Sequence, residues 1–337
     1  MVSMKDIARE CGVSVATVSK ALGGHSDIGA ETRERIRSAA VEMGYHTNAA
    51  ARALKTNRSY DIGVLFVDKR SSGLSHEYFS AVLDSVRVEA ERSGCDITFI
   101  SANVGRNPAT YLQHCRYRGV DGVVIASVDF QDPMVLELVN SEIPLVTIDH
   151  VFNNRIAVVS DNVTGTEELV RYAVSAGHRR IGFIHGEMTS VTENRLLGFH
   201  RACEEAGLSI PDAYIRQSAY HDPNSCYEQT KELLSLEDRP TCILFPDDFS
   251  FIGGMNAIRE AKLRIPEDIS VLGYDGISLS QMISPRLTTY RQDTEALGRT
   301  AASRLVELIE HPKTALLDRV IVPGRLVQGG SVTPPGS

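Results

Sequence analysis

Near the N-terminus the sequence reads Val13-Ser14-Val15-Ala16-Thr17-Val18-Ser19-Lys20, a pattern typical of a short helix that begins directly after a turn. Gly12 can adopt the backbone conformation that a tight turn needs. The Ser14 hydroxyl can accept hydrogen bonds from the first amides of the helix. These signals predict a helix that is preceded by a tight turn and capped by Ser14.

The segment before the turn, Met4–Cys11, fits another short helix, which Ser3 can cap together with Asp6 at a capping-box spacing. Apolar residues recur at helical spacing in both helices, so they can pack together. These residues are Ile7, Ala8, Cys11, Val15, Val18 and Leu22.

The residues left near the open face of the second helix are Ala16, Thr17, Ser19 and Lys20. Helix, tight turn and helix with a short polar outer face is the layout of a helix-turn-helix head that reads DNA. A plain helical hairpin that touches no nucleic acid would pack in the same way. This segment alone therefore leaves both interpretations open.

A third helix fits Glu31–Met43, and Gly44 is placed to end it. At this point the chain resembles the LacI/GalR family of bacterial transcriptional repressors, and the resemblance covers essentially the whole sequence. It is carried by Lys5-Asp6-Ile7-Ala8, Gly12-Val13-Ser14, Thr17-Val18-Ser19, Glu31-Thr32-Arg33, Gly44-Tyr45 and Ala51-Arg52-Ala53-Leu54. Several motifs in the same order are specific, whereas a lone helix-turn-helix motif is a weak signal.

The resemblance implies a helix-turn-helix DNA-binding domain over residues 1–46 and a hinge helix and linker over residues 47–58. Val15 and Ala16 are small and apolar, which favours contact with thymine methyl groups. Family members usually have proline where Thr47 stands, so this hinge is expected to fold less readily without DNA. The residues expected to contact DNA are Ser14, Val15, Ala16, Thr17, Ser19, Lys20, Asn48, Ala51, Leu54 and Lys55.

Charge is divided unevenly along the 337 residues. Residues 1–58 contain nine Lys and Arg against six Asp and Glu, a net charge of +3, whereas the whole chain carries −8, which leaves −11 for residues 59–337. Only the N-terminal part therefore has the positive net charge that favours binding to DNA phosphates. The negatively charged remainder would be repelled by a duplex.

The six cysteines show no paired ligand spacing and are expected to be buried thiols in a reducing cytoplasm. No apolar run reaches the length of a membrane span. The N-terminus opens directly into a capped helix, with no apolar stretch of a signal peptide. We therefore expect a cytoplasmic protein that has no membrane partner.

From Tyr60 onward, strand-forming runs alternate with amphipathic helical stretches, which indicates parallel sheets covered on both faces. The units are many for one open sheet, so we predict two doubly wound subdomains. The resemblance implies a periplasmic-binding-protein-like domain over residues 59–337, which binds the effector and dimerises. Subdomain 1 is expected at about 59–160 and 291–319, and subdomain 2 at about 161–290 and 320–337.

Two such subdomains enclose a cleft, and the carboxyl ends of their strands face it. Carboxylates accept hydrogen bonds from vicinal hydroxyls, a guanidinium donates them, and an aromatic face covers the apolar side of a sugar ring. An aspartate at a strand end often caps a helix instead, and this alternative is left open for Asp161, as is a place in the core for Phe79. The residues expected to bind the effector are Tyr78, Phe79, Asp129, Asp149, Asp161, Arg195, Asp247 and Asp275.

An enzymatic function is not expected, because no phosphate-binding glycine loop and no framed nucleophile are present. His76-Glu77 lacks a second histidine at ligand spacing, so neither a metal nor another cofactor is expected. The main alternative to a DNA-binding regulator is a ligand-binding module in which the N-terminal helices serve only dimerisation. The open face of residues 15–20 argues against it.

The sequence therefore predicts a homodimeric repressor that binds double-stranded DNA at an inverted-repeat operator, since one short recognition helix covers only a half-site. The expected effector is a small polar molecule, most simply a carbohydrate. The alternative is a nucleobase or another metabolite that acts as a co-repressor. Asp247 stands where sugar-responsive family members commonly carry asparagine, which puts in doubt which ligand fits.

Overall fold

The computed structural model describes residues 2–23, 27–45, 58–67 and 73–336. The chain divides into two compact units, Met1–Ser59 and Tyr60–Ser337. Thr47 and the expected DNA contacts Asn48, Ala51, Leu54 and Lys55 lie outside the described residues.

The first unit is built from three helices, α1 (Met4–Glu10), α2 (Val15–Leu22) and α3 (Ala30–Glu42). The backbone N–H and the hydroxyl of Ser3 both donate to the Asp6 carboxylate. Gly12 forms the turn with a φ of +63°. The Ser14 hydroxyl accepts a hydrogen bond from the backbone N–H of Thr17 and thus caps α2. The helices, the turn and the caps predicted from the sequence are confirmed.

The core of the first unit differs from the prediction at one position. Ile7, Val18 and Ile36 are fully buried and join all three helices. Val15 was expected to pack with them, but 42% of its surface is exposed. Val15 is the first residue of α2, where the helical face is only beginning, and Val13 from the turn packs against the core in its place.

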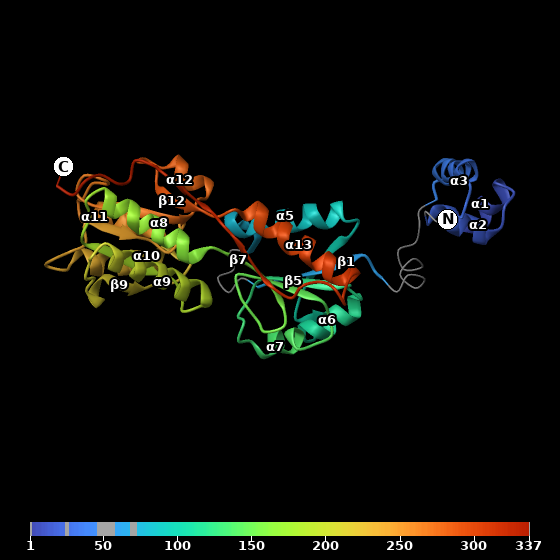
Figure 1. Ribbon diagram of the computed structural model, residues 1–337, viewed down its shortest axis with the longest axis horizontal. Helices are drawn as coiled ribbons and strands as arrows, with labels where there is room; N and C mark the ends of the chain where they lie inside the picture. The colour runs from blue at the N-terminus through green and yellow to red at the C-terminus, as the bar shows by residue number, and fades with distance from the viewer. Residues whose placement is uncertain (1, 24–26, 46–57, 68–72, 337) are drawn as a thin grey trace. The chain divides into compact units, whose positions relative to one another are not determined.

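The second unit consists of two lobes, each with a six-stranded sheet. In the first lobe all strands run parallel, in the order β13-β7-β6-β5-β1-β2. Helices α5 and α13 cover one face of this sheet, and α6 and α7 cover the other (Figure 1). The bounds are β1 Asp61–Phe66, η1 Gly73–Ser75, α5 Glu77–Arg92, β2 Asp96–Ile100, β3 Asn103–Val104, β4 Asn107–Pro108, α6 Tyr111–Arg118, β5 Gly122–Ser127, α7 Pro133–Val139, β6 Leu145–Ile148, β7 Ile156–Ser160, α13 Thr294–Glu310 and β13 Arg319–Val322.

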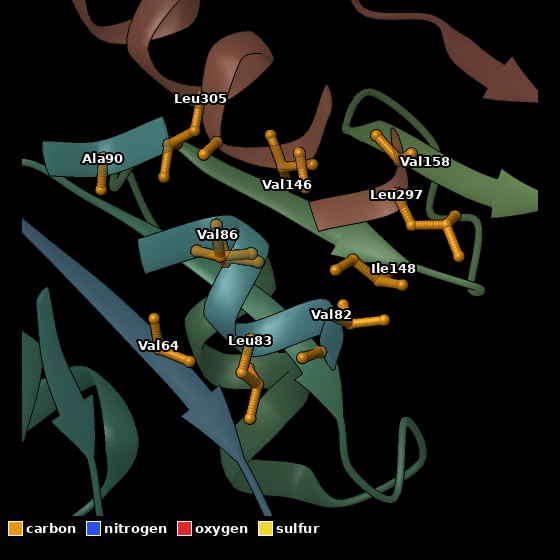
Figure 2. Close-up of a cluster of buried hydrophobic side chains, with 14 of the residues drawn as sticks. Val64, Val82, Leu83, Val86, Ala90, Val146, Ile148, Val158, Leu297 and Leu305 are labelled. Carbon is orange, nitrogen blue, oxygen red and sulfur yellow. The ribbon is translucent and has the colours of Figure 1, made fainter. Parts of the chain in front are cut away.

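Alternation along the strands explains the two covered faces of the first lobe. Val64, Val146 and Ile148 point to the layer of α5 and α13, where they meet Val86 and Leu305 (Figure 2). Their neighbours along the strands belong to the layer of α6 and α7, and these are Leu65, Val123, Ile125 and Leu145. Each strand is therefore apolar on both sides, as a buried parallel sheet requires.

The second lobe repeats this plan with the strand order β14-β12-β11-β10-β8-β9, in which only β14 pairs antiparallel. Helices α8 and α9 cover one face, and α10 and α11 cover the other. The bounds are α8 Asn162–Ser175, β8 Ile181–His185, α9 Ser190–Glu205, η2 Asp212–Tyr214, β9 Ile215–Gln217, α10 Pro223–Leu234, β10 Cys242–Leu244, α11 Phe251–Glu260, β11 Ser270–Asp275, α12 Ser278–Met282, β12 Thr288–Arg291 and β14 Arg325–Val327.

The chain passes between the two sheets three times, after Ser160, after Arg291 and after Val322. The boundaries expected from the sequence need two corrections. Residues 319–322 pair in parallel with β7 and bury Val322, so the last crossover lies beyond Val322 and not at residue 320. Arg291 pairs with β11 and β14, so it belongs to the second lobe.

Candidate functional site

The outer face of α2 presents a small surface in the first unit. Val15, Ala16 and Lys20 are exposed, whereas Thr17 and Ser19 are half-buried. The Lys20 ammonium pairs with the carboxylate of Asp27, and both side chains are about half exposed, at 49% and 52%. This pair could not be predicted from the sequence, because the two residues belong to different segments. The pair holds the Lys20 ammonium beside the open face of α2 and balances its charge with the Asp27 carboxylate.

In the second unit, four of the predicted effector residues come from the expected strand ends or helix starts. Tyr78 lies in the first turn of α5, Asp149 follows β6, Asp247 follows β10 and Asp275 ends β11. Arg195 was expected just before a helix. It lies inside α9 instead, because α9 already begins at Ser190 after the capping residue Thr189.

Arg195 is 5% exposed and is held on several sides. Its Nε donates to Asn162 Oδ1 at 2.8 Å, and its Nη1 donates to the carbonyl oxygen of Pro246 at 2.7 Å. The guanidinium carbon lies 3.5 Å from the centre of the Tyr274 ring and 5.5 Å from that of Tyr220. These contacts leave Nη2 as the group directed toward Asp275, whose Oδ1 is 4.0 Å away.

Asp275 is the acidic partner at this centre. It is 6% exposed, and its Oδ1 accepts a hydrogen bond from Gln292 Nε2 at 2.7 Å. Burial raises the pKa of Asp275 to about 6, against the opposing effect of Arg195. Arg195 and Asp275 thus place a hydrogen-bond donor beside an acceptor at the end of β11.

The carboxylates of Asp149 and Asp247 already accept hydrogen bonds from other residues of the protein. Asp149 Oδ1 accepts from the backbone N–H of Ser160 at 2.7 Å, and its Oδ2 accepts from the Tyr78 hydroxyl at 3.0 Å. Burial raises the pKa of Asp149, although these hydrogen bonds oppose the rise. Asp149 therefore joins α5 to the strand at the first crossover.

Asp247 is 1% exposed and receives three hydrogen bonds, from the backbone N–H and hydroxyl of Ser250 and from the backbone N–H of His221. His221 Nδ1 lies 3.6 Å from Asp247 Oδ1. Burial works against the charged form, but His221 and the hydrogen bonds outweigh it and lower the pKa of Asp247. The Asp247 carboxylate is thus a structural anchor for the segment around His221.

The remaining predicted residues have local roles. Asp129 accepts from the backbone N–H of Gln131 in a turn, and Asp161 caps α8 by accepting from the backbone N–H of Thr164. Phe79 packs within 5.5 Å of the rings of Phe66, Tyr78 and His221. Sequence reasoning missed several residues around the centre, and these are His76, Asn162, Tyr220, His221, Tyr274 and Gln292.

Over residues 2–23, 27–45, 58–67 and 73–336, no three His, Cys, Asp or Glu side chains are grouped so that they could hold a metal ion. Within the same described part of the chain, no helix is both long and apolar enough to cross a membrane.

Comparison with known proteins gives matches at both ends of the chain. Residues 3–48 match the model for bacterial regulatory proteins of the lacI family, and residues 170–332 match a periplasmic binding protein-like domain. The HTH-type transcriptional repressor PurR of Haemophilus influenzae (strain PittEE) is 32% identical over 315 residues, which cover 92% of each chain.

Solved structures resemble the chain over most of its length. The lac repressor dimer bound to operator and the anti-inducer ONPF has a TM-score of 0.80 and 27% identity, covering 98% of this chain and 99% of its own. A LacI family transcriptional regulator from Enterococcus faecium with bound ribose has a TM-score of 0.69 and 25% identity. That alignment covers 81% of this chain and 99% of the regulator.

Proposed function

Because the chain belongs to the LacI family of bacterial regulatory proteins and is a DNA-binding transcriptional repressor, we propose that a small polar ligand controls its affinity for DNA. Arg195 and Asp275 bind this ligand. The protein is a regulator and not an enzyme. It acts as a homodimer in the bacterial cytoplasm, and its two heads bind an inverted-repeat operator.

The observation that carries this proposal is the buried pair of Arg195 and Asp275. A guanidinium nitrogen and a carboxylate 4.0 Å apart offer a donor and an acceptor that match two neighbouring hydroxyl groups. A carbohydrate fits this pattern, and the similarity to a regulator with bound ribose supports it. Asp149 and Asp247 offer less to a ligand, because their oxygens already accept hydrogen bonds from the protein.

A nucleobase is the second candidate, and the aromatic wall favours it. The rings of Phe79 and His221 lie 5.4 Å apart, and the ring of Tyr220 lies 6.1 Å from that of His221. Flat heterocycles stack on such rings while their edges take one donor and one acceptor. The two ligand classes therefore share the Arg195–Asp275 pair and differ in how they use the rings.

A ligand panel should identify the class. We expect one group of compounds, either monosaccharides or free nucleobases at millimolar concentration, to raise the melting temperature, since a ligand that binds only the folded state stabilises it by mass action. The same compound should change operator affinity by about 5–150-fold in a fluorescence-anisotropy titration. If both groups leave the melting temperature and operator binding unchanged, the proposed control is wrong.

The head should select its operator through Val15, Ala16 and Lys20. Replacing Val15 and Ala16 by a larger polar pair is expected to switch the preferred half-site, because both side chains are exposed on the outer face of α2. Each altered base pair should change the binding free energy by about 1–3 kcal/mol. Binding-site selection from a random DNA library measures this change.

The matched control is Val41→Thr, on α3, because Val41 is 80% exposed and lies away from the outer face of α2 in sequence. This variant should return the wild-type half-site. An unchanged consensus for the Val15-Ala16 variant would show that α2 does not read the bases in this way.

A further inference from the structure

Asn162 contacts the guanidinium of Arg195 from the start of α8. Asn162 is 3% exposed, and its Oδ1 accepts the hydrogen bond from Arg195 Nε at 2.8 Å. Its Nδ2 donates to the carbonyl oxygen of Ser160, 3.3 Å away. If the amide were turned over, its NH₂ group would face the Nε–H group of Arg195, and two donors would meet. The two neighbours therefore fix the orientation of the Asn162 amide.

A close approach of two helices brings Asn162 within reach of Arg195. Asn162 is the first residue of α8, which Asp161 caps, and Arg195 lies on α9. Gly198 follows Arg195 on α9, and a Cβ atom at Gly198 would lie only 2.3 Å from the carbonyl oxygen of Val163 on α8. The contact between Asn162 and Arg195 therefore depends on a residue without a side chain at position 198.

The guanidinium needs two acceptors to fix its position. The carbonyl oxygen of Pro246 accepts from Nη1 at 2.7 Å, and the ring of Tyr274 supports one face of the group at 3.5 Å. These two contacts alone would still allow the group to turn within its own plane. Among the residues that the structure describes, Asn162 is the only side chain that accepts a hydrogen bond from Arg195. With both acceptors in place, Nη2 is directed toward Asp275.

We infer that Asn162 is a positioning residue of the effector site, which holds the Nε edge of Arg195 so that Nη2 stays directed toward Asp275. A guanidinium with one acceptor fewer samples more orientations, and a ligand that needs one of them must restrict it and binds more weakly. The inference rests on the proposed role of Arg195 in ligand binding. It adds a residue that acts on the ligand only through Arg195.

The position of the guanidinium can be measured without any ligand, by nuclear magnetic resonance of the full-length chain with ¹⁵N-labelled arginine. The Nε–H signal of Arg195 is identified by its absence in Arg195→Lys. We expect this proton to exchange slowly with water in the wild type and about 10-fold faster in Asn162→Leu, which has no acceptor. Asn162→Ala should behave in the same way, which guards against a folding defect in one variant.

A rescue variant and a matched control separate this role from a general effect on folding. Asn162→Asp keeps an acceptor oxygen of the same reach, so the exchange of the Arg195 proton should remain slow. The control is Thr166→Val, on the same helix. Thr166 is fully buried, and its hydroxyl donates to the backbone carbonyl oxygen of Asn162, so this variant loses a buried hydrogen bond but keeps the Asn162 amide. Its exchange rate should equal that of the wild type.

The consequence for binding is measured by isothermal titration with D-ribose and with adenine, one probe for each ligand class. Whichever probe binds the wild type should bind Asn162→Leu about 10-fold more weakly, and Thr166→Val with unchanged affinity. If neither probe binds, the exchange rates alone decide whether Asn162 holds Arg195.

Three outcomes would overturn the inference. The first is an exchange rate in Asn162→Leu that equals the rate in the wild type. The second is an equal acceleration in Thr166→Val or in Asn162→Asp. The third is an unchanged affinity of Asn162→Leu for a probe that binds the wild type. Because the exchange is measured without ligand, a failed ligand panel leaves it unaffected, and a failed exchange test leaves the panel unaffected.

Discussion

Arg195→Ala is expected to abolish the response to the ligand while operator binding by the ligand-free repressor is retained. The substitution removes the guanidinium that faces Asp275, together with its hydrogen bonds to Asn162 and Pro246. A hydrogen bond to a charged group contributes about 1.5–3 kcal/mol. Ligand affinity should therefore fall by roughly 10–150-fold. Isothermal titration with the ligand that the panel identifies measures this loss directly.

The matched control for this prediction is Arg201→Ala. Arg201 lies on the same helix, α9, but its side chain is 57% exposed and pairs with Glu167 at the surface. Its removal should leave both the ligand affinity and the ligand's effect on operator binding at wild-type values. If Arg195→Ala still responds as the wild type does, the ligand binds elsewhere in the protein.

The second large effect is expected on stability, from Asp247→Ala. This change leaves the backbone N–H groups of His221 and Ser250 without their acceptor and leaves His221 without its counter-ion. Breaking a buried pair by removing one partner costs about 3–5 kcal/mol. The free energy of unfolding, measured in urea, should fall by this amount. Asp247→Asn, which keeps the size and one acceptor oxygen, should lose less.

The effect of Asp247 also depends on pH in a defined direction. Its pKa is lowered in the folded state, so its contribution is present above the ordinary value of 3.8 and is lost as the pH falls. The pKa of His221 is raised, so its contribution is present below the ordinary value of 6.5 and is lost as the pH rises through the folded value. The difference in the free energy of unfolding between the wild type and Asp247→Asn should therefore be largest between about pH 4 and 6.5.

A surface aspartate serves as the control for stability. Asp238 pairs with Arg180, and both side chains are largely exposed, so Asp238→Ala should cost less than about 1 kcal/mol. An Asp247→Ala variant that unfolds at the same urea concentration as Asp238→Ala would show that Asp247 does not anchor the second lobe.

The sequence predicts the long apolar strands well and the short strands of mixed composition poorly. Leu145–Ile148 and Ile181–His185, for example, are apolar runs between loop signals, which mark them as strands in the sequence alone. Ile215–Gln217 and Thr288–Arg291 were missed, since their short mixed runs carry no periodic signal. Tyr220, His221 and Gln292 follow those two strands, which explains why they were missed as well.

For the site, the sequence indicated which kinds of residue are present, but not which of their polar groups are already hydrogen-bonded within the protein. Asp149, Asp247 and Asp275 look alike in the sequence, each at the end of an apolar strand. In the structure their neighbours differ. Asp149 accepts hydrogen bonds from Ser160 and Tyr78, and Asp247 accepts them from Ser250 and His221. Asp275 instead faces the Arg195 guanidinium. Such differences depend on contacts between distant segments, which no local pattern records.

The three crossovers of the second unit have a consequence for biosynthesis. Most of the first lobe is translated before Ser160. Its covering helix α13 and its edge strand β13 are translated only after almost the entire second lobe. At about 5–20 residues per second, the ribosome needs roughly 8–30 s to travel from Ser160 to Val322. During that interval the apolar residues that later pack against Leu297 and Leu305 face the solvent or a chaperone. The nascent first lobe must therefore be protected from aggregation until its last strand emerges.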